Sequence, residues 1–379
     1  MSNYETQAMY VVVIILSVFF AFKSQKNFSY EKVVVTKIRT LPFFLSFFFP
    51  WFVMCFTNIG SDYSNYYFII NRLLWDNYAS FSSEEPGVNI LFLLLRSVVG
   101  GDVDITIFLV KSISIVLIFI SILIAKDYIK IGYSVTAYLL LEWLPSFYLI
   151  TIALAASIVQ LAVALYFFRD KKILPFMLVL LAAQFHNSAY IFIPIFLACI
   201  FTATMNYSNL KRFFFTAIYV MIIGLAGSIF NWAQTYLPWF HYSGYSNNSF
   251  SGSGIMIFVI YVPLFFIVYK LMNITCNEKI SNCIYIFALS ECLFYILSYR
   301  FRVIERMEYF LFPLYTLLIP YIFRETSIDR PNPRKKTVIN SYALLTIIYL
   351  LFRGYQVFID RTTIESGVGF YHFFNPFIE

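Results

Sequence analysis

The stretch ITIFLVKSISIVLIFISILIA, at residues 105–125, decides the fold. It stays apolar over roughly 20 residues, which is the length that a helix needs to cross the hydrocarbon core of a bilayer. Backbone polar groups inside hydrocarbon find no water to bond, so a run of this kind must satisfy them internally as a helix. The sequence therefore predicts a membrane-spanning helix here.

Similar apolar runs recur along the whole chain. They lie near residues 8–22, 41–57, 105–125, 133–149, 152–168, 173–187, 188–203, 213–232, 254–272, 281–299, 307–323 and 338–354. Charged residues make up 12% of the sequence, whereas a soluble domain carries about a quarter. We predict an all-α polytopic membrane protein of about 12 transmembrane helices, forming a single transmembrane domain over residues 1–379.

The basic residues set the orientation of the chain. Lysine and arginine gather in alternate joining segments, among them 23–39, 169–172 and 324–336. Cytoplasmic loops of membrane proteins are enriched in these cations, so this pattern places both termini on the outer side. The net charge of +7 then has a topological cause and does not indicate a nucleic-acid partner.

Two outer segments follow from this orientation. Residues 58–104 form an outer loop, and residues 355–379 form an outer C-terminal tail. The apolar piece GVNILFLLLRSVVGG at 87–101 would carry Lys126 and Lys130 to the outer side if it crossed the membrane once. We therefore interpret it as a re-entrant or interfacial helix on the outer face.

The cations of the outer segments are all arginine. They are Arg72, Arg96, Arg300, Arg302, Arg306, Arg353 and Arg361. A guanidinium group holds phosphate or carboxylate through two parallel hydrogen bonds and keeps its charge when it is partly desolvated. We interpret this bias as an anion-binding site on the outer face, although lysine is also depleted there for topological reasons.

The first outer loop carries Asp62, Tyr66, Arg72 and Glu85. On a helix, Asp62 and Tyr66 lie four residues apart on one face. A carboxylate accepts hydrogen bonds from sugar hydroxyls, and tyrosine rings stack on apolar sugar faces, so this loop is a candidate substrate site. The alternative is an N-cap aspartate followed by tyrosines at the membrane interface.

A second polar group, Phe185-His186-Asn187-Ser188, interrupts a long apolar stretch at an outer turn. Polar residues at membrane depth are costly unless they line a cavity or pair with neighbours. His186 is a candidate for proton transfer or for a hydrogen bond to phosphate. A purely structural histidine is the alternative.

The densest cluster of charges lies at residues 299–309. On a helix, Arg302 and Arg306 share a face and fit one pyrophosphate, and Glu305 and Tyr309 share another. Arg300 lies close by in the sequence. The alternative is a charged turn whose residues form salt bridges with one another.

The sequence predicts no metal and no cofactor. The chain has five cysteines without CxxC or metal-ligand spacing, and we expect them to be small core residues. Three histidines are too few to favour a multi-histidine metal site.

Several short motifs together resemble the EpsG/Wzy-type bacterial polysaccharide polymerases over nearly the whole chain. They are Gly60-Ser61-Asp62 with Tyr66, Glu85-Pro86-Gly87, Phe185-His186-x-Ser188, Arg302…Arg306…Tyr309 and Tyr371…Asn375-Pro376. One region departs from the pattern. Relatives often carry Arg-Gln before a small-residue run in a middle helix, whereas residues 151–160 hold no arginine.

The resemblance implies a GT-C-like membrane glycosyltransferase of the bacterial inner membrane. It would join undecaprenyl-pyrophosphate-linked repeat units on the periplasmic side, with lipid-linked donor and acceptor glycans and membrane lipids as its partners. A protein that regulates chain length is a further partner that the sequence leaves open.

The chemistry that the resemblance implies assigns roles to the candidate residues. Arg302 and Arg306, assisted by Arg300, would stabilise the leaving pyrophosphate. Asp62 or His186 would take the proton of the acceptor hydroxyl. The remaining candidates would bind substrate: Tyr66, Arg72, Glu85, Glu305 and Tyr309.

Two other functions share part of this pattern. A flippase for lipid-linked oligosaccharides would need ionisable groups along a path open to both faces, but here the charges gather on one face, with Lys111 and Glu142 as the main exceptions. An O-antigen ligase would use the same donor chemistry, usually with one much longer outer loop.

Overall fold

The computed structural model describes residues 3–30, 33–60, 62–75, 85–203, 277–298, 302–328 and 333–361, together with residues 216–218, 221, 225, 228, 235–236 and 373. The predicted run 254–272 lies outside these residues, and so does most of 213–232. Helices occupy each of the other predicted apolar runs, as expected for an all-α membrane protein.

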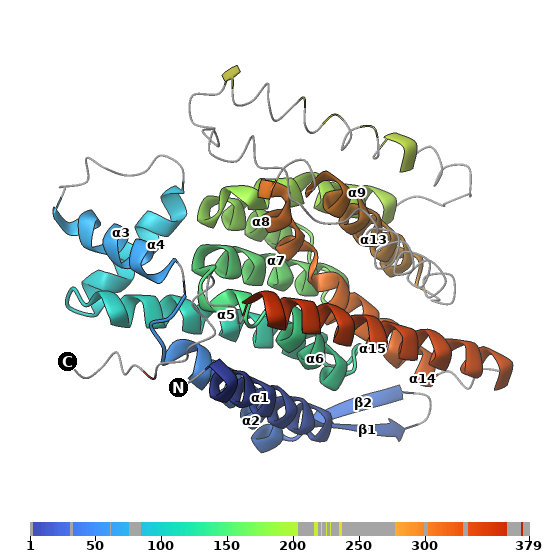
Figure 1. Cartoon of the computed structure of the whole chain (residues 1–379). Helices are drawn as coiled ribbons and strands as arrows, with labels where there is room; N and C mark the ends of the chain where they lie inside the picture. The colour runs from blue at the N-terminus through green and yellow to red at the C-terminus, as the bar shows by residue number, and fades with distance from the viewer. Residues whose placement is uncertain are drawn as a thin grey trace. The chain divides into compact units, whose positions relative to one another are not determined.

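The elements are shown in Figure 1. The first half contains α1 (Asn3–Ser24), β1 (Gln25–Tyr30), β2 (Val33–Ile38), α2 (Thr40–Cys55), α3 (Tyr63–Trp75), α4 (Pro86–Val98), α5 (Val103–Ala125), α6 (Ile131–Leu141) and the 3₁₀ helix η1 (Pro145–Phe147). The second half contains α7 (Ile150–Phe168), α8 (Ile173–Phe185), η2 (Asn187–Ile191), α9 (Phe192–Ala203), α13 (Glu278–Ser298), η5 (Arg302–Leu311), η6 (Leu314–Leu318), α14 (Ile319–Ile328) and α15 (Pro333–Arg361).

Among the described residues, 3 helices are long and apolar enough to cross a membrane, namely Asn3–Ser24, Val103–Ala125 and Ile150–Phe168. Several shorter apolar helices accompany them, and together they make this a multi-pass membrane protein. The helix α4 has 13 residues. It is therefore about 20 Å long, against a hydrocarbon core of about 30 Å.

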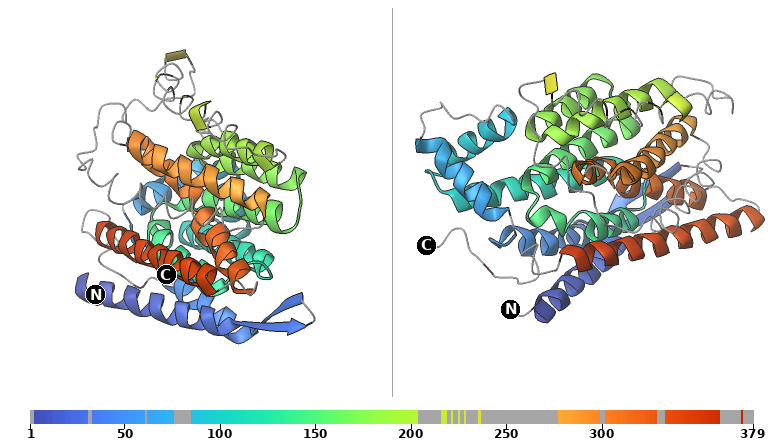
Figure 2. Two further views of the ribbon diagram at one scale, coloured as in Figure 1. Left: turned by 90° about the vertical axis from the view of Figure 1, so that its right-hand side faces the viewer. Right: turned by 45° about the horizontal axis from the view of Figure 1, so that its top comes forward.

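The hairpin of β1 and β2 is a departure from the all-α prediction. Its strands are antiparallel, with Gln25 opposite Ile38 and Tyr30 opposite Val33, and it projects from the end of α1 (Figure 2). The side-chain amide of Gln25 donates through Nε2 to the carbonyl of Ile129 at 2.8 Å. Its Oε1 accepts from the backbone N–H of Ile131 at 3.0 Å. The hairpin is thereby fixed to the turn between α5 and α6.

The same turn also contacts α14. Arg324 donates to the carbonyl of Lys126 at 3.0 Å, and the amide of Lys130 bonds the carbonyl of Pro320 at 3.4 Å. Three basic segments, at 23–39, 126–130 and the end of α14, therefore meet at one end of these helices.

The chain folds as two compact units: unit 1 (Met1–Asn187 and Phe312–Glu379) and unit 2 (Ser188–Leu311). In unit 1, α7 packs between α5 and α8, α1 packs on α2 and α6, and α15 covers α6. α7 is apolar around its whole circumference, and nearly all of its residues are buried, as expected for a central helix.

In unit 2, α9 packs against α13, which also contacts η5. A disulfide joins Cys199 to Cys283 across the first two helices, with 5.0 Å between their Cα atoms. The prediction of unpaired core cysteines is therefore wrong for this pair, whose partners lie 84 residues apart in the sequence. Cys55 and Cys292 form no disulfide with any described residue, and Cys276 lies outside the described residues.

Candidate functional site

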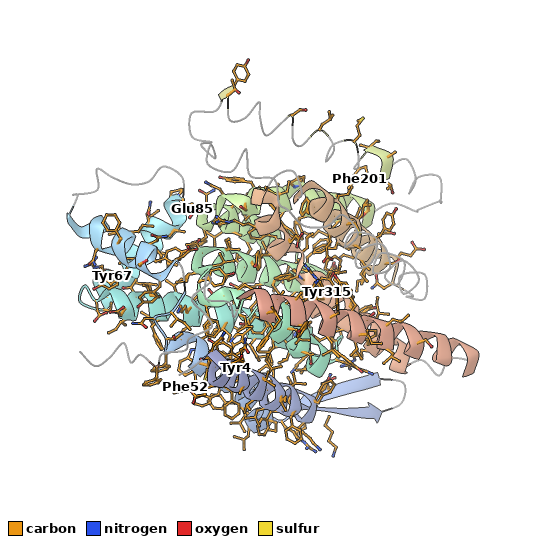
Figure 3. All side chains as sticks on the ribbon, viewed as in Figure 1. Tyr4, Phe52, Tyr67, Glu85, Phe201 and Tyr315 are labelled. Carbon is orange, nitrogen blue, oxygen red and sulfur yellow. A yellow bond between two sulfur atoms is a disulfide. The ribbon has the colours of Figure 1, made fainter. Side chains whose placement is uncertain are left out.

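Polar side chains meet in unit 1 near the first turns of α3, α4 and α7 and the last turn of α8. We call Tyr66, Glu85, Thr151 and His186 the polar cluster. Glu85 is the N-cap residue of α4, and His186 is the C-cap residue of α8. Figure 3 shows Glu85 at the start of α4, beside the end of α8. The cluster therefore combines helix ends from distant parts of the sequence.

An ion-pair contact joins Glu85 to His186. Nδ1 of the imidazole lies 2.7 Å from Oε1 of the carboxylate, and the side chains are 9% and 24% exposed for His186 and Glu85. The backbone amide of Asn187 approaches the same oxygen at 3.5 Å. Because a carboxylate only accepts hydrogen bonds, Nδ1 must carry a proton in this contact.

The other imidazole nitrogen, Nε2 of His186, is buried and has no hydrogen-bond partner in the part of the chain that the structure describes. In a neutral imidazole with its proton on Nδ1, Nε2 is an acceptor. A buried acceptor without a donor costs free energy and requires an explanation. This nitrogen is suited to a donor that arrives with a substrate.

Two hydroxyl groups complete the polar cluster. The phenol of Tyr66 lies 3.2 Å from Oγ1 of Thr151, which in turn lies 3.4 Å from Nδ1 of His186. Burial raises the pKa of Tyr66 to about 12; the Thr151 hydrogen bond lowers it, and the charges of Asp62 and Glu85 raise it further. Tyr66 is therefore a neutral phenol near neutral pH.

A glycine allows the contact between Glu85 and His186. A Cβ atom on Gly87 would lie 2.8 Å from the carbonyl oxygen and 2.9 Å from Cβ of Gln184 in α8. Pro86 occupies the first turn of α4, where its missing N–H is not needed. The Glu-Pro-Gly sequence therefore starts a helix directly against the end of α8.

A second glycine positions Asp62. Gly60 has a φ of +118°, and a Cβ there would lie 2.5 Å from Cβ of Tyr148. Its carbonyl accepts from the amide of Tyr63 at 3.1 Å, and the carbonyl of Asp62 accepts from Tyr66 at 3.0 Å. Asp62 therefore lies one helical turn before Tyr66, as the sequence predicted.

Lys111 and Thr151 were not among the site residues predicted from the sequence. Nζ of the buried Lys111 donates to the carbonyl of Thr57 at 3.0 Å and lies 5.5 Å from the ring centroid of Tyr63. The Tyr63 phenol donates to Asp104. The position of Lys111 inside an apolar run could have marked it as a site residue from the sequence. Thr151 is uncharged and lies at a helix start, so the sequence gave no such indication for it.

Arg96 does not fit the predicted anion site. Its guanidinium is buried and donates to the carbonyls of Gly101, at 2.8 Å, and Ile70, and to Oδ1 of Asn71 at 3.4 Å. These hydrogen bonds join the turn between α4 and α5 to the second half of α3. Arg96 is therefore a structural residue in this part of the molecule.

The candidates at residues 300–309 belong to unit 2. Arg306 is half-buried and Tyr309 is buried, while Arg300 and the side chains of Arg72, Arg302 and Glu305 lie outside the described part of the chain.

The helix that carries these candidates, η5, is a 3₁₀ helix with about three residues per turn. Arg306 and Tyr309, three residues apart, therefore share a face of this helix. The prediction that Arg302 and Arg306 share a face assumed an α-helix, in which residues four apart align.

Comparisons with known proteins identify the family. No curated protein and no solved structure matches the chain. A family model described as the EpsG family matches residues 40–368, which is most of the chain. By this match, the protein belongs to the EpsG family.

Proposed function

We propose that this protein is a polymerase that joins undecaprenyl-pyrophosphate-linked oligosaccharide repeat units into a surface polysaccharide. Membership of the EpsG family supports a polysaccharide polymerase-like role, and the apolar helices support a multi-pass membrane protein. The observation that carries the proposal is the polar cluster, in which a carboxylate, an imidazole and two hydroxyls meet at helix ends.

The direction of three helices supports a site on the periplasmic face. Each of α5, α7 and α8 has a polar residue of this region at one end, namely Asp104, Thr151 and His186. Each has a basic residue at the other end: Lys126, Arg169 and Lys172. Because basic ends mark the cytoplasm, the polar cluster would face the periplasm of the inner membrane.

In the proposed reaction, a hydroxyl of one lipid-linked unit attacks the anomeric carbon of a glycan held on a second lipid. The bond between that carbon and the pyrophosphate oxygen breaks, and its electron pair leaves with the pyrophosphate. Asp62 and His186 are the candidates that take the hydroxyl proton. Arg302 and Arg306, assisted by Arg300, would stabilise the charge that develops on the leaving group.

The remaining candidates would hold the sugars. Tyr66 offers a ring and a hydroxyl, and Arg72, Glu305 and Tyr309 would contact sugar or phosphate groups. The bond to pyrophosphate already activates the donor, so the reaction needs no nucleotide sugar. A GT-C-like architecture of about 12 spans would suit lipid-linked donors.

A strain that lacks this gene tests the proposal directly. Its surface glycan, separated on a gel, should consist of single repeat units, and expression of the gene should restore the ladder of chain lengths. A normal ladder in the deletion strain rules the polymerase out. Full-length glycan retained on lipid would instead indicate a ligase, and a complete loss of surface glycan would indicate a flippase.

The arginine assignment is tested by Arg302→Ala. We expect the ladder to disappear while the protein level and the export of lipid-linked units stay unchanged. Arg169→Ala, which removes an exposed arginine at the other end of α7, is the control and should keep the ladder. A normal ladder with Arg302→Ala would overturn the assignment.

A further inference from the structure

We infer that His186 is the general base for the acceptor hydroxyl and that Glu85 is the residue that positions it. This inference rests on the proposed polymerase function and decides between the two candidate bases. It also changes the role of Glu85, which the sequence suggested as a sugar-binding residue.

The tautomer of the imidazole follows from its contact with Glu85. Oε1 of the carboxylate lies 2.7 Å from Nδ1 and so holds the proton on that nitrogen. The lone pair of a neutral His186 is then on Nε2. A carboxylate that fixes the tautomer and ring orientation in this way is a recurrent partner of functional histidines.

The environment of Nε2 leaves this lone pair available. Nε2 is a buried side-chain atom without a hydrogen-bond partner among the described residues. A sugar hydroxyl is the donor that this atom lacks, and it is also the group that must lose a proton in the proposed reaction. The oxygen of Glu85, by contrast, already contacts Nδ1 and the amide of Asn187.

Positive charge develops on the imidazole during the reaction. As the acceptor oxygen bonds to the anomeric carbon, its O–H bond breaks and the proton moves to Nε2. The imidazole becomes a cation in a site where an unpaired charge is costly. The carboxylate at 2.7 Å compensates that positive charge and so stabilises the transition state. His186 touches the substrate, and Glu85 acts through His186.

The ionisable groups that face this pair come from several elements. Glu85 directly precedes α4. Asp62 and Tyr66 lie at the start of α3, and the charges of Asp62 and Glu85 both raise the pKa of the Tyr66 phenol. Thr151 of α7 supplies an uncharged hydroxyl at 3.4 Å from Nδ1. Glu85 is therefore the only carboxylate that directly contacts the imidazole among the described residues.

The test uses the full-length protein in detergent, with lipid-linked repeat units extracted from a strain that lacks the gene. For Glu85→Gln we expect the turnover rate to fall by roughly 10²–10⁴-fold with little change in KM, because a glutamine amide can donate to Nδ1 and move the proton to Nε2. Glu278→Gln, an exposed carboxylate at the start of α13, is the matched control and should keep the wild-type rate.

Two further readouts separate positioning from mere folding. The pH–rate profile should differ between Glu85→Gln and wild type, because the substitution removes the negative charge that lies next to the imidazole. His186→Gly should be inactive and should regain activity when free imidazole is added. Glu85→Asp should recover part of the rate that Glu85→Gln loses.

Defined outcomes overturn the inference. A Glu85→Gln rate within about threefold of wild type would do so, as would an unchanged pH profile, since general-base steps contribute at least about 10²-fold. If Glu85→Gln does not fold, the rescue of His186→Gly decides, and failure of imidazole to restore activity rejects the base role. Wild-type protein that extends no chains in this assay would refute the proposed function itself, which is a different result.

Discussion

At the scale of single residues, the hydroxyl of Tyr66 connects two parts of the site. It bonds Thr151, which also touches His186, while its own helix begins directly after Asp62. Because burial raises the pKa of Tyr66 to about 12, the phenol keeps its proton near neutral pH. Tyr66 therefore contributes a hydrogen bond and not a charge.

Tyr66→Phe should lower the free energy of unfolding by about 0.5–1.5 kcal/mol, the net value of one hydrogen bond. The shape of the pH–rate profile should stay that of wild type. Because the pKa of Tyr66 is higher in the folded state, folding favours the neutral phenol. The contribution of Tyr66 to stability is therefore complete below about pH 10 and is lost as the pH rises toward 12. Thermal unfolding in detergent from about pH 7 to 11 should show a smaller alkaline loss in the variant than in wild type.

Tyr4→Phe is the matched control for that experiment, since Tyr4 is 85% exposed on α1. It should leave both the stability and its alkaline decrease unchanged. An equal alkaline loss in wild type and Tyr66→Phe would contradict the assignment of a buried neutral phenol.

Most residues of the polar cluster could be predicted from the sequence, but the contact between Glu85 and His186 could not. The turn from Asp62 to Tyr66 follows from their spacing of four residues. Glu85 and His186 stood out separately as polar residues next to apolar runs. Their contact joins chain segments about a hundred residues apart, and no local pattern in one sequence encodes such a contact.

At the scale of elements, the site depends on how closely α4 approaches α8. Gly87 is the contact point, because its missing side chain leaves room for the backbone of Gln184. Glu85, which carries the carboxylate, lies two residues before Gly87 at this same helix start. The distance between the two helices therefore sets the distance between the carboxylate and the imidazole.

Gly87→Ala should separate the two helices and destabilise the protein by about 1–3 kcal/mol, the usual cost of overpacking. The ladder of glycan lengths should shorten, because Glu85 would move away from His186. Gly100→Asn is the control: nothing lies within 4 Å of a Cβ there, and asparagine tolerates its φ of +72°. A variant Gly87→Ala with wild-type melting temperature and ladder would show that the helices do not meet as described.

Other elements show why sequence patterns can mislead. The strands QKNFSY and VVVTKI lie in a segment whose basic residues predict a loop, although the β-branched run in the second favours a strand. The 3₁₀ geometry of η5 changes which of its residues align, and amino-acid spacing alone does not reveal it. Apolar run length, by contrast, predicted the long helices because the bilayer fixes that length.

At the scale of the whole molecule, the two units have different stabilising features. Unit 1 has the buried helix α7 at its centre, and unit 2 has a covalent link between α9 and α13. The cysteines of this link are 84 residues apart. In the chain-entropy model, a cross-link over such a distance stabilises by about 4–5 kcal/mol.

Cys199→Ser should reduce the stability of unit 2 by about 2–5 kcal/mol, the upper end being the full loop-closure value, and leave Cys283 as a new thiol. Maleimide labelling of denatured wild type should reach Cys199 and Cys283 only after reduction, as mass spectrometry of peptides can show. Cys292→Ser is the control, because Cys292 is not part of this disulfide and its substitution breaks no cross-link. Labelling of Cys199 without reductant would contradict the disulfide.

The placement of the polar cluster at the helix ends opposite the basic residues has an energetic consequence. If the proposed chemistry occurs there, the acceptor, the donor, the released proton and the leaving lipid all remain on one side of the membrane. Elongation then moves no charge across the bilayer and is driven only by the phosphate ester bond that it breaks. Sealed vesicles loaded with lipid-linked units should therefore continue to extend chains after an uncoupler has abolished the membrane potential.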